Sequence, residues 1–320
     1  MTRAACALIL ALACPAGAFE LNWPVDCTPG ETCFIQQYVD RDPGPGVTDF
    51  ACGTLAYDGH EGTDIALPSL AALQAGVTVR AAAPGTVLGV RDGMPDILVS
   101  DPAAPPLEGR DCGNGVVIDH GQGWQTQYCH MARGSVAVRS GDSVAAGTPL
   151  GQVGLSGRTE FPHLHVTVRK DGQTVDPFDP DGTLACGETA PPLWSDPPAY
   201  RPGGLIAAGF DIAVPKYEAV KAGMPARAVL PAKAPALVIW GYYFGNRAGD
   251  ELRLTITGPE GEVISETVPL DRTQAQAFRA VGKRLRGPSG WPVGDYTGEA
   301  VLIRAGAEID RIVIAARIDG

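Results

Sequence analysis

Short runs of β-branched and aliphatic residues, separated by glycine-rich turns, constrain the fold of this chain more than any other feature. Between residues 51 and 180 the runs include GVTVRAAAPGTVLGV, GNGVVIDHG, WQTQYCHM and HLHVTVRKDG, and after residue 203 they return as ALVIWGYYFG and DELRLTITGPEGEVISETV. Short apolar runs bounded by turn residues are typical of β-strands. The sequence therefore predicts a mostly β protein built from antiparallel sheets.

The length of the chain predicts two domains, because 320 residues are more than a single hydrophobic core usually needs. We divide it into a leader, a disulfide-tied N-terminal segment, a first β domain, a proline-rich linker and a smaller immunoglobulin-like β-sandwich, at residues 1–18, 19–50, 51–186, 187–203 and 204–320. In the last part, Gly258 to Gly261 predicts a hairpin turn, and residues 273–285 are the one stretch with helical character. This part contains no histidine and no cysteine, so we expect no chemistry there.

The first eighteen residues, MTRAACALILALACPAGA, have an early arginine, an apolar run and a small-residue end, which predicts a secretory signal peptide cut after Ala18. The apolar run is too short for a stable membrane anchor. Lipidation of Cys14 is the alternative, but position 11 is alanine where such sites have leucine. No second stretch of membrane length follows. The sequence predicts a periplasmic or secreted protein without a stable membrane span.

Cutting after Ala18 leaves six of the eight cysteines, and an even number in an exported chain predicts disulfides. Cys27 and Cys33 could close a small loop, and Cys112 and Cys129 flank a hairpin, which would leave Cys52 with Cys186. The sequence alone does not choose among the possible pairings. A thiolate zinc site would need paired C-x-x-C spacings, and the chain has none.

The formal net charge of −11 argues against nucleic acid as a partner. A protein that binds the phosphate backbone needs a basic face. The charge does not exclude a polymer that carries amines and peptides.

The segment HLHVTV places two histidines on one face of a predicted strand. Side chains two apart in a strand point the same way, so His163, His165 and Thr167 share one face. The aliphatic residues between them share the other face. This pattern suits a metal held over a core, although a solvated histidine pair would give the same pattern.

Two other segments of the same predicted domain carry histidine: HEGTD, with His60 and Asp64 four positions apart, and YCHM, with His130. Imidazole and carboxylate are both zinc ligands, and catalytic zinc has three protein ligands and an open position. Each segment alone is weak evidence, but together they predict one site.

These motifs resemble the LytM/lysostaphin-type zinc metallopeptidases, which have an H-x-G-x-D motif and a downstream H-x-H. HEGTD matches the first motif and HLH the second, in order, and the resemblance extends over residues 53 to 180. It implies that His60, Asp64 and His165 bind Zn²⁺. It also implies that His130 and His163 stay off the metal and act on the substrate or the water as general base and oxyanion donor, in an order that the sequence does not decide.

The remaining candidates near the motifs are given other roles. Glu61 lacks the second histidine that an H-E-x-x-H motif needs, so we expect a surface residue. His120, at a hairpin turn, is expected to be structural. Tyr128 would point into the same cleft as His130 if the strand continues regularly, and would otherwise be packed or exposed. Compared with the family's usual pattern, residues 91–112 are an insertion, which we expect to overhang one edge of the sheet.

The resemblance implies an exported zinc endopeptidase that hydrolyses peptide cross-links or stems of bacterial peptidoglycan through a metal-activated water. A non-catalytic wall-binding module that activates another cell-wall hydrolase is the alternative, and a protease of free proteins is a third. Proteins of the non-catalytic kind lose ligands, whereas all five positions are present here. The C-terminal domain is expected to dock on the wall or on a cell-envelope protein.

Overall fold

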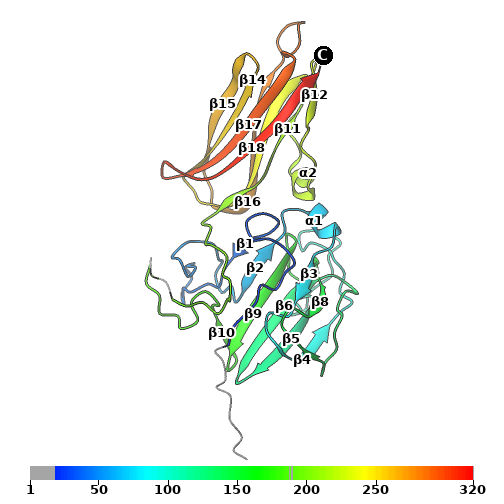
Figure 1. Ribbon diagram of the computed structural model, residues 1–320, viewed down its shortest axis with the longest axis vertical. Coiled ribbons are helices and arrows are strands. Elements are labelled where there is room, and N and C mark those ends of the chain that lie inside the picture. Colours follow the sequence, from blue (N-terminus) through cyan, green and yellow to red (C-terminus); the bar gives the residue numbers. More distant parts are fainter. Residues whose placement is uncertain (1–18, 187, 189, 320) are drawn as a thin grey trace, which may run out of the picture.

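The computed structural model describes residues 19–186, 188 and 190–319, so the predicted signal peptide lies outside the described residues. The fold is mostly β, as predicted, and Figure 1 shows two lobes stacked along the long axis. We call them the first unit (19–203) and the second unit (204–319). The elements of the first unit are β1 (Phe34–Gln37), β2 (Thr63–Ala66), α1 (Leu70–Gln74), β3 (Thr78–Arg80), β4 (Gly85–Arg91), β5 (Asn114–Gly121), β6 (Trp124–Met131), β7 (Ser143–Val144), β8 (Pro149–Gln152), β9 (His163–Lys170) and β10 (Gln173–Val175). Those of the second unit are β11 (Gly204–Asp211), α2 (Tyr217–Ala222), β12 (Val229–Pro231), β13 (Ala236–Asn246), β14 (Asp250–Gly258), β15 (Gly261–Leu270), β16 (Gln274–Arg284), β17 (Gly294–Arg304) and β18 (Ala307–Asp319).

The first unit is built on one antiparallel sheet with the strand order β1-β2-β9-β6-β5-β4-β7, and β10 pairs with β9. A small second sheet joins β3 and β8. Leu164, Val166 and Val168 of β9 are buried in the core, as the alternation predicted. The opposite face of the same strands carries the histidines, so one face of the sheet packs and the other holds polar side chains.

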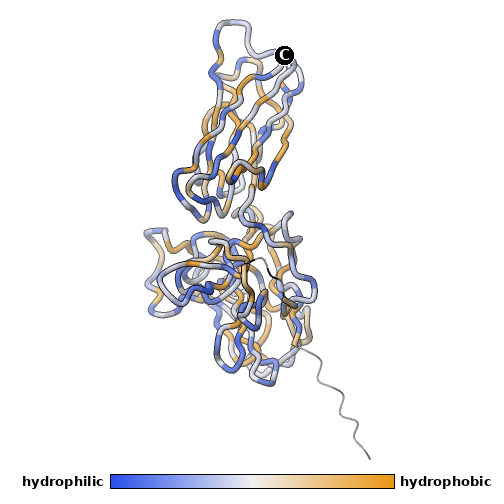
Figure 2. The backbone as a smooth tube through the Cα atoms, turned by 90° about the vertical axis from the view of Figure 1, so that its left-hand side faces the viewer, coloured by the Kyte–Doolittle hydropathy of each residue, from blue (hydrophilic) through white to orange (hydrophobic). Residues whose placement is uncertain are grey.

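The second unit consists of a three-stranded sheet, β11-β13-β16, and a five-stranded sheet, β12-β18-β17-β14-β15. Apolar side chains of both sheets, including Ile239 and Leu254, form one buried cluster, and Figure 2 shows apolar stretches in the interior of both units. The pairing is antiparallel except between β12 and β18. The turn predicted at Gly258 to Gly261 joins β14 and β15. The immunoglobulin-like assignment and the domain boundaries remain predictions.

The helical character expected for residues 273–285 is wrong, because these residues form strand β16. The strand pairs with β13 along its whole length, from Gln274 opposite Asn246 to Arg284 opposite Ala236. Sheet pairing and burial of Ala277 and Val281 outweigh the intrinsic preference of the segment.

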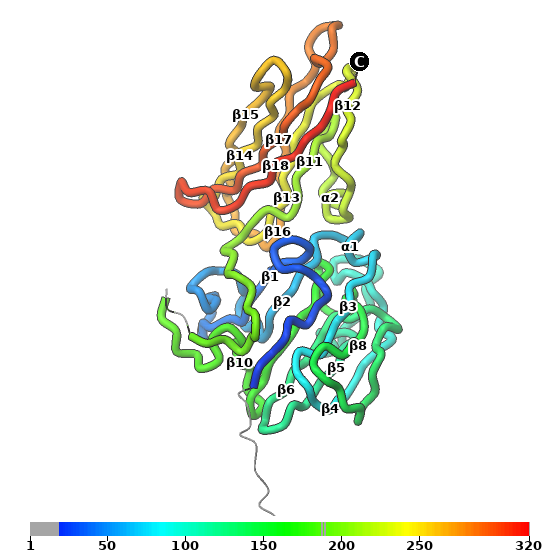
Figure 3. The backbone as a smooth tube through the Cα atoms, in the orientation of Figure 1, coloured from blue at the N-terminus to red at the C-terminus, as the bar shows by residue number. Residues whose placement is uncertain are grey.

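The two units are in direct contact at the edge strand β1, which lies beside β16 in Figures 1 and 3. The rings of Phe34 and Phe244 are 4.4 Å apart, and Phe244 belongs to the buried core of the first unit. The side chain of Gln36 donates to the carbonyl of Ala275 at 2.8 Å, and Gln276 donates to Gln36 at 2.9 Å. The second unit is therefore held against the sheet that carries the histidines.

The proline-rich stretch before β11 packs against the N-terminal residues of the first unit. Leu193 and Trp194 are buried, and the Leu193 carbonyl accepts a hydrogen bond from the amide of Leu21. Within the described part of the chain, no helix is long and apolar enough to cross a membrane.

The three disulfides join Cys27 to Cys33, Cys52 to Cys186 and Cys112 to Cys129, which confirms the expected pairing. The second spans 134 residues of sequence and connects the approach to His60 with the end of the first unit. The third lies beside His130.

Candidate metal centre

The pairing of β2 with β9 brings the two motifs together. Asp64 lies directly opposite His165, and Ala66 lies opposite His163. Residues opposite each other in an antiparallel pair project from the same face, so Asp64 shares the face of both histidines. The loop before β2 adds His60, and Gly62 in this loop allows the close approach, because a Cβ there would meet His165 Nε2 at 2.5 Å.

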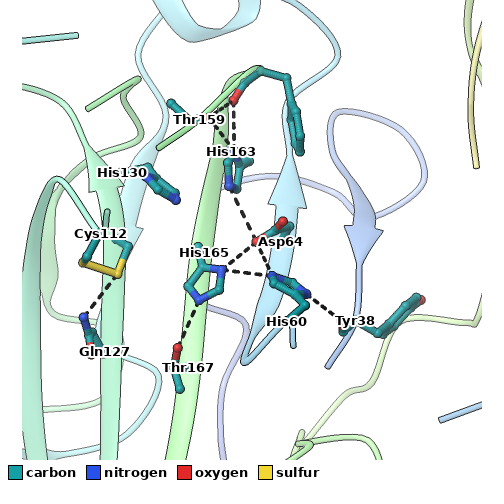
Figure 4. A network of polar contacts seen from close by, with 12 residues as sticks. Tyr38, His60, Asp64, Cys112, Gln127, His130, Thr159, His163, His165 and Thr167 are labelled. Atoms are coloured by element: carbon teal, nitrogen blue, oxygen red, sulfur yellow. Dashed lines mark hydrogen bonds and ion pairs between the residues drawn. A yellow bond between two sulfur atoms is a disulfide. The ribbon is translucent and has the colours of Figure 1, made fainter. Parts of the chain in front are cut away.

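Three donor atoms converge on one point, as Figure 4 shows. Asp64 Oδ1 is 3.2 Å from His60 Nε2 and 2.8 Å from His165 Nδ1, and the two nitrogens are 3.2 Å apart. His60, Asp64 and His165 are the group of the described residues whose ligand atoms are spaced for a metal ion. They are the three residues predicted as ligands.

The outer nitrogens of the two histidines contact groups that can fix the rings. His60 Nδ1 donates to the carbonyl of Tyr38 at 2.6 Å, which leaves Nε2 with a lone pair. Thr167 Oγ1 lies 3.0 Å from His165 Nε2 and can accept its proton, which would leave Nδ1 free. Such outer partners set the tautomer and ring orientation of metal-binding histidines.

The other two predicted residues lie beside this group. His163 Nε2 is 3.6 Å from Asp64 Oδ1, and its Nδ1 donates to the carbonyl of Phe161 at 2.9 Å. His130 Nδ1 donates to the carbonyl of Ser156 at 2.8 Å, and its ring centre is 4.6 Å from that of His163. Both rings are buried and both have their Nε2 lone pair free.

His130 reaches the cleft through a break in strand alternation. Its φ of 61° lies in the left-handed region that favours glycine, and the register of β5 and β6 shifts at this point. The neighbouring disulfide of Cys129 and the bond from the His130 amide to the Cys112 carbonyl hold the backbone here. Backbone strain of this kind is frequent at functional sites.

Tyr128 is packed in the core instead of pointing into the cleft. It is completely buried, and its hydroxyl accepts hydrogen bonds from the amide of Ala82 and from Thr126. Of the two alternatives left open for Tyr128, the packed one is observed, because the strand does not continue regularly: the register of β5 and β6 shifts between Tyr128 and Met131. His120 continues the same network to Thr126 and to the Pro84 carbonyl, away from the metal centre, which agrees with a structural role.

The ionisable side chains in the cleft shift one another's pKa values. Burial raises the pKa of Asp64, but the imidazoles of His163, His60 and His165 outweigh it and hold the pKa of this carboxyl well below its usual range. Burial lowers the pKa of His130 well below its usual value, and the neighbouring histidines add to the effect. Burial also lowers the pKa of His163 against the opposing effect of Asp64. In both rings burial therefore favours the neutral form of the imidazole.

Of these residues, His165 and His130 line a cleft of about 180 Å³. Its rim includes Tyr57, Arg158 and Arg169, and Glu61 lies there as an exposed residue, as expected. The size suits a short stretch of an extended polymer.

The segment 92–112 is more than an overhanging edge, because it anchors the loop that holds both buried rings. Asp96 accepts hydrogen bonds from the amides of Leu155 and Arg133, both at 2.8 Å, and the amide of Val99 donates to the carbonyl of Thr159. The anchored loop supplies the carbonyls of Ser156 and Phe161. No sequence pattern predicts these backbone groups, because the position of a carbonyl depends on the fold and not on the residue type.

Residues 58–177 match the model of Peptidase family M23. Among curated proteins, the DD-carboxypeptidase/endopeptidase Mpg of Neisseria meningitidis serogroup B is 33% identical over 120 residues, which cover 37% of this chain and 22% of that protein. The peptidoglycan DD-endopeptidase ShyA of Vibrio cholerae is 32% identical over 116 residues, which cover 36% of this chain and 21% of that protein. The match therefore spans about a fifth of each relative.

Among solved structures, a zinc containing peptidase from Vibrio cholerae is 26% identical, with a TM-score of 0.29 over 46% of this chain and 39% of that one. The family match and the named relatives confirm the resemblance drawn from the two motifs. The family match falls on the first unit, and the second unit lies outside its residues 58–177.

Proposed function

We propose that this chain is an exported, zinc-dependent endopeptidase that hydrolyses peptide cross-links or stems of bacterial peptidoglycan. The observation that carries the proposal is the convergence of His60 Nε2, Asp64 Oδ1 and His165 Nδ1 beside two further buried histidines. The substrate class is taken from the relatives, one of which is named as a DD-carboxypeptidase/endopeptidase and another as a peptidoglycan DD-endopeptidase.

The donor set fits zinc. Two imidazole nitrogens and a carboxylate oxygen lie 2.8 to 3.2 Å apart, somewhat closer than the edges of roughly 3.3 Å that a tetrahedron with bonds of about 2.0–2.1 Å has, so a small outward shift of the donors would admit the ion. With the outer nitrogens carrying the protons, two lone pairs and a carboxylate face one another, and this arrangement is repulsive without a cation between them. When bound, Zn²⁺ supplies a Lewis acid that polarises a carbonyl and lowers the pKa of water.

His130 and His163 are arranged to move a proton. Because Nδ1 of each ring donates to a backbone carbonyl, each Nε2 can accept a proton in the resting state. The neutral form favoured by burial is the form that a general base needs. A ring that has taken up a proton becomes a donor, to the leaving amine or to the oxyanion. The same pair of rings can thus first accept a proton and then donate it.

Export is supported by the three disulfides, because such bonds persist in oxidising compartments. Docking of the second unit on a cell-envelope protein remains a prediction.

Digestion of purified sacculi tests the function. We expect the zinc-loaded chain, without its leader, to release peptide fragments whose cross-links or stems are cut, and the Asp64→Ala chain to release none. Chromatography and mass spectrometry of the fragments identify the bond. Binding to sacculi without any cleavage would favour the non-catalytic alternative, and cleavage of casein with intact sacculi would favour a protease of free proteins.

A further inference from the structure

A second cavity, of about 230 Å³, lies between the two units next to the metal cleft. Its walls come from β1, from the loop before His60, and from the facing ends of β13 and β16. The lining residues are Gln36, Gln37, Thr54, Leu55, Ala56, Tyr57, Gly245, Asn246, Thr273, Gln274 and Ala275. None of these residues is charged, whereas the metal cleft is rimmed by Arg158 and Arg169.

The cavity lies on the same face of the sheet as the candidate metal centre, one strand further towards β1. Gln37 is the register partner of Asp64, so it stands one strand away from the metal donors and on the same face. Tyr57 lines both cavities, and its ring centre is 4.5 Å from that of His60. An extended chain lying across the strands would pass from the cleft over Tyr57 into this cavity.

Two buried amide oxygens in the cavity wall have no hydrogen-bond partner. They are Gln37 Oε1, on a residue that is 8% exposed, and Asn246 Oδ1, on a residue that is 0% exposed. The orientation of the Asn246 amide is fixed, because its nitrogen donates to the carbonyl of Arg272 at 2.6 Å. Buried acceptors without a partner are uncommon and costly, and they point to a missing donor.

The wall is held in place by the contact between the units. Gln36 bonds to Ala275 and Gln276, and Gly245 lies so close to Leu55 that a Cβ would meet its Cδ2 at 2.5 Å. The cavity is therefore a fixed feature of the docked chain.

We propose that this cavity is a second substrate subsite, in which Gln37 and Asn246 accept hydrogen bonds from the N–H groups of the peptide on one side of the scissile bond. The inference rests on the proposed function and adds the second unit to the binding surface. Neutral amide acceptors select backbone or side-chain amide N–H groups, and the absence of a carboxylate from the lining disfavours a bare ammonium group.

The test uses the full zinc-loaded chain and three peptides: a four-residue peptide containing the scissile bond, and the same peptide extended by three residues at its amino or carboxyl end. In the native chain, one extension should raise kcat/KM. In Gln37→Met, which keeps the side-chain length but has no acceptor, we expect this gain to fall about tenfold, through KM. Gln37→Glu, which restores an acceptor of the same shape, should recover most of it.

Gln173→Met is the matched control, because Gln173 is exposed on β10 and is not among the residues that line either cavity. Asn246→Leu tests the acceptor of the second unit and keeps the test decisive if Gln37→Met does not fold. An extension gain that is unchanged in both acceptor variants would overturn the subsite, as would an equal loss for the short and the extended peptide.

Calorimetric binding of the extended peptide to His163→Ala, with and without Gln37→Met, separates this inference from the proposed function. Weaker binding in the double variant supports the subsite even if no peptide is cut. Absence of cleavage by the native zinc-loaded chain would contradict the proposed endopeptidase function but not the subsite.

Discussion

The two units of this protein are both β, yet they treat buried polar groups in opposite ways. In the first unit, one face of the sheet is apolar and the other buries His60, Asp64, His130 and His163. In the second unit, two sheets cover each other with apolar faces, and the buried carboxylate of Asp250 is paired with an arginine.

This difference depends on whether a face of a β-sheet packs against a second sheet. A sheet face that packs on another sheet has to be apolar, because unpaired polar groups there would cost free energy. A face left without a second sheet can bury polar side chains, provided that each finds a hydrogen bond. The inner faces of the two sheets of the second unit pack against each other, so the subsite proposed above involves only the end of this unit that contacts the first.

The largest loss of activity is expected from substitution of the three proposed metal donors. It distinguishes two buried aspartates, Asp64 of the first unit and Asp250 of the second. His60→Ala, Asp64→Ala and His165→Ala should each lose zinc and lower activity by at least about a thousandfold, because a three-ligand site loses much of its binding free energy with one donor. Zinc per chain is measured by mass spectrometry. Asp250→Ala is the control and should lower stability with zinc retained, since it breaks the buried pair with Arg304. Stoichiometric zinc in all three donor variants would contradict the site.

The next effect is expected from the two rings that stay off the metal. His130→Ala and His163→Ala should keep about one zinc per chain and lower kcat by roughly a hundredfold or more, because in the proposed mechanism these two rings transfer protons. Zinc content and steady-state kinetics are the measurements. Loss of zinc in His163→Ala with retention in His165→Ala would mean that the two roles are reversed.

A smaller effect is expected from Asp96, which acts through the loop that holds both rings. Asp96→Ala frees the amides of Leu155 and Arg133 and should lower kcat about tenfold with zinc unchanged, since loosening of the loop misplaces the Ser156 carbonyl. Asp92→Ala is the matched control, because Asp92 also binds backbone amides, of Gly134 and Val136, but none in that loop. Equal losses in the two variants would assign the effect to general loosening of the segment.

The smallest effect concerns stability and Asp176, a buried carboxyl of the first unit outside the cleft. Burial raises its pKa to about 7, and its Oδ2 has no partner. The unfolded chain releases this proton near pH 4, whereas the folded chain holds it to about pH 7, so stability falls as the pH rises between these values. Asp176→Asn should therefore be more stable by up to about 4 kcal/mol above pH 7 and equal to the native chain below pH 4. Thermal melts across this range check it, and an equal gain at every pH would refute the titration.

Much of the site was predictable because strand alternation and motif order are local properties. The alternation of HLHVTV placed His163 and His165 on one face, and the pairing with β2 then required only a register that buries Leu164 and Val166. The cysteine spacing likewise agreed with the observed disulfides.

The failures arose where distant parts of the chain decide the local structure. Tyr128 and His130 separate because a bulge in β6 depends on its pairing with β5. The segment 274–284 is a strand because β13 pairs with it. The carbonyls of Tyr38, Ser156 and Phe161 orient three histidines, and no residue pattern announces a carbonyl that the fold places.

The position of the second unit also affects self-association. An edge strand offers unpaired backbone groups to any other strand, and exposed edges lead to aggregation. The large sheet of the first unit ends at β1, which is covered by β16, and at β7, which has only two residues. In the second unit the sheets end at β11 and β16 and at β12 and β15, and of these edge strands β15 carries exposed glutamates and Pro269. Strand addition to the sheet that holds the histidines is thus hindered at both of its ends, and one long edge of the second unit, β15, is charged and interrupted by proline.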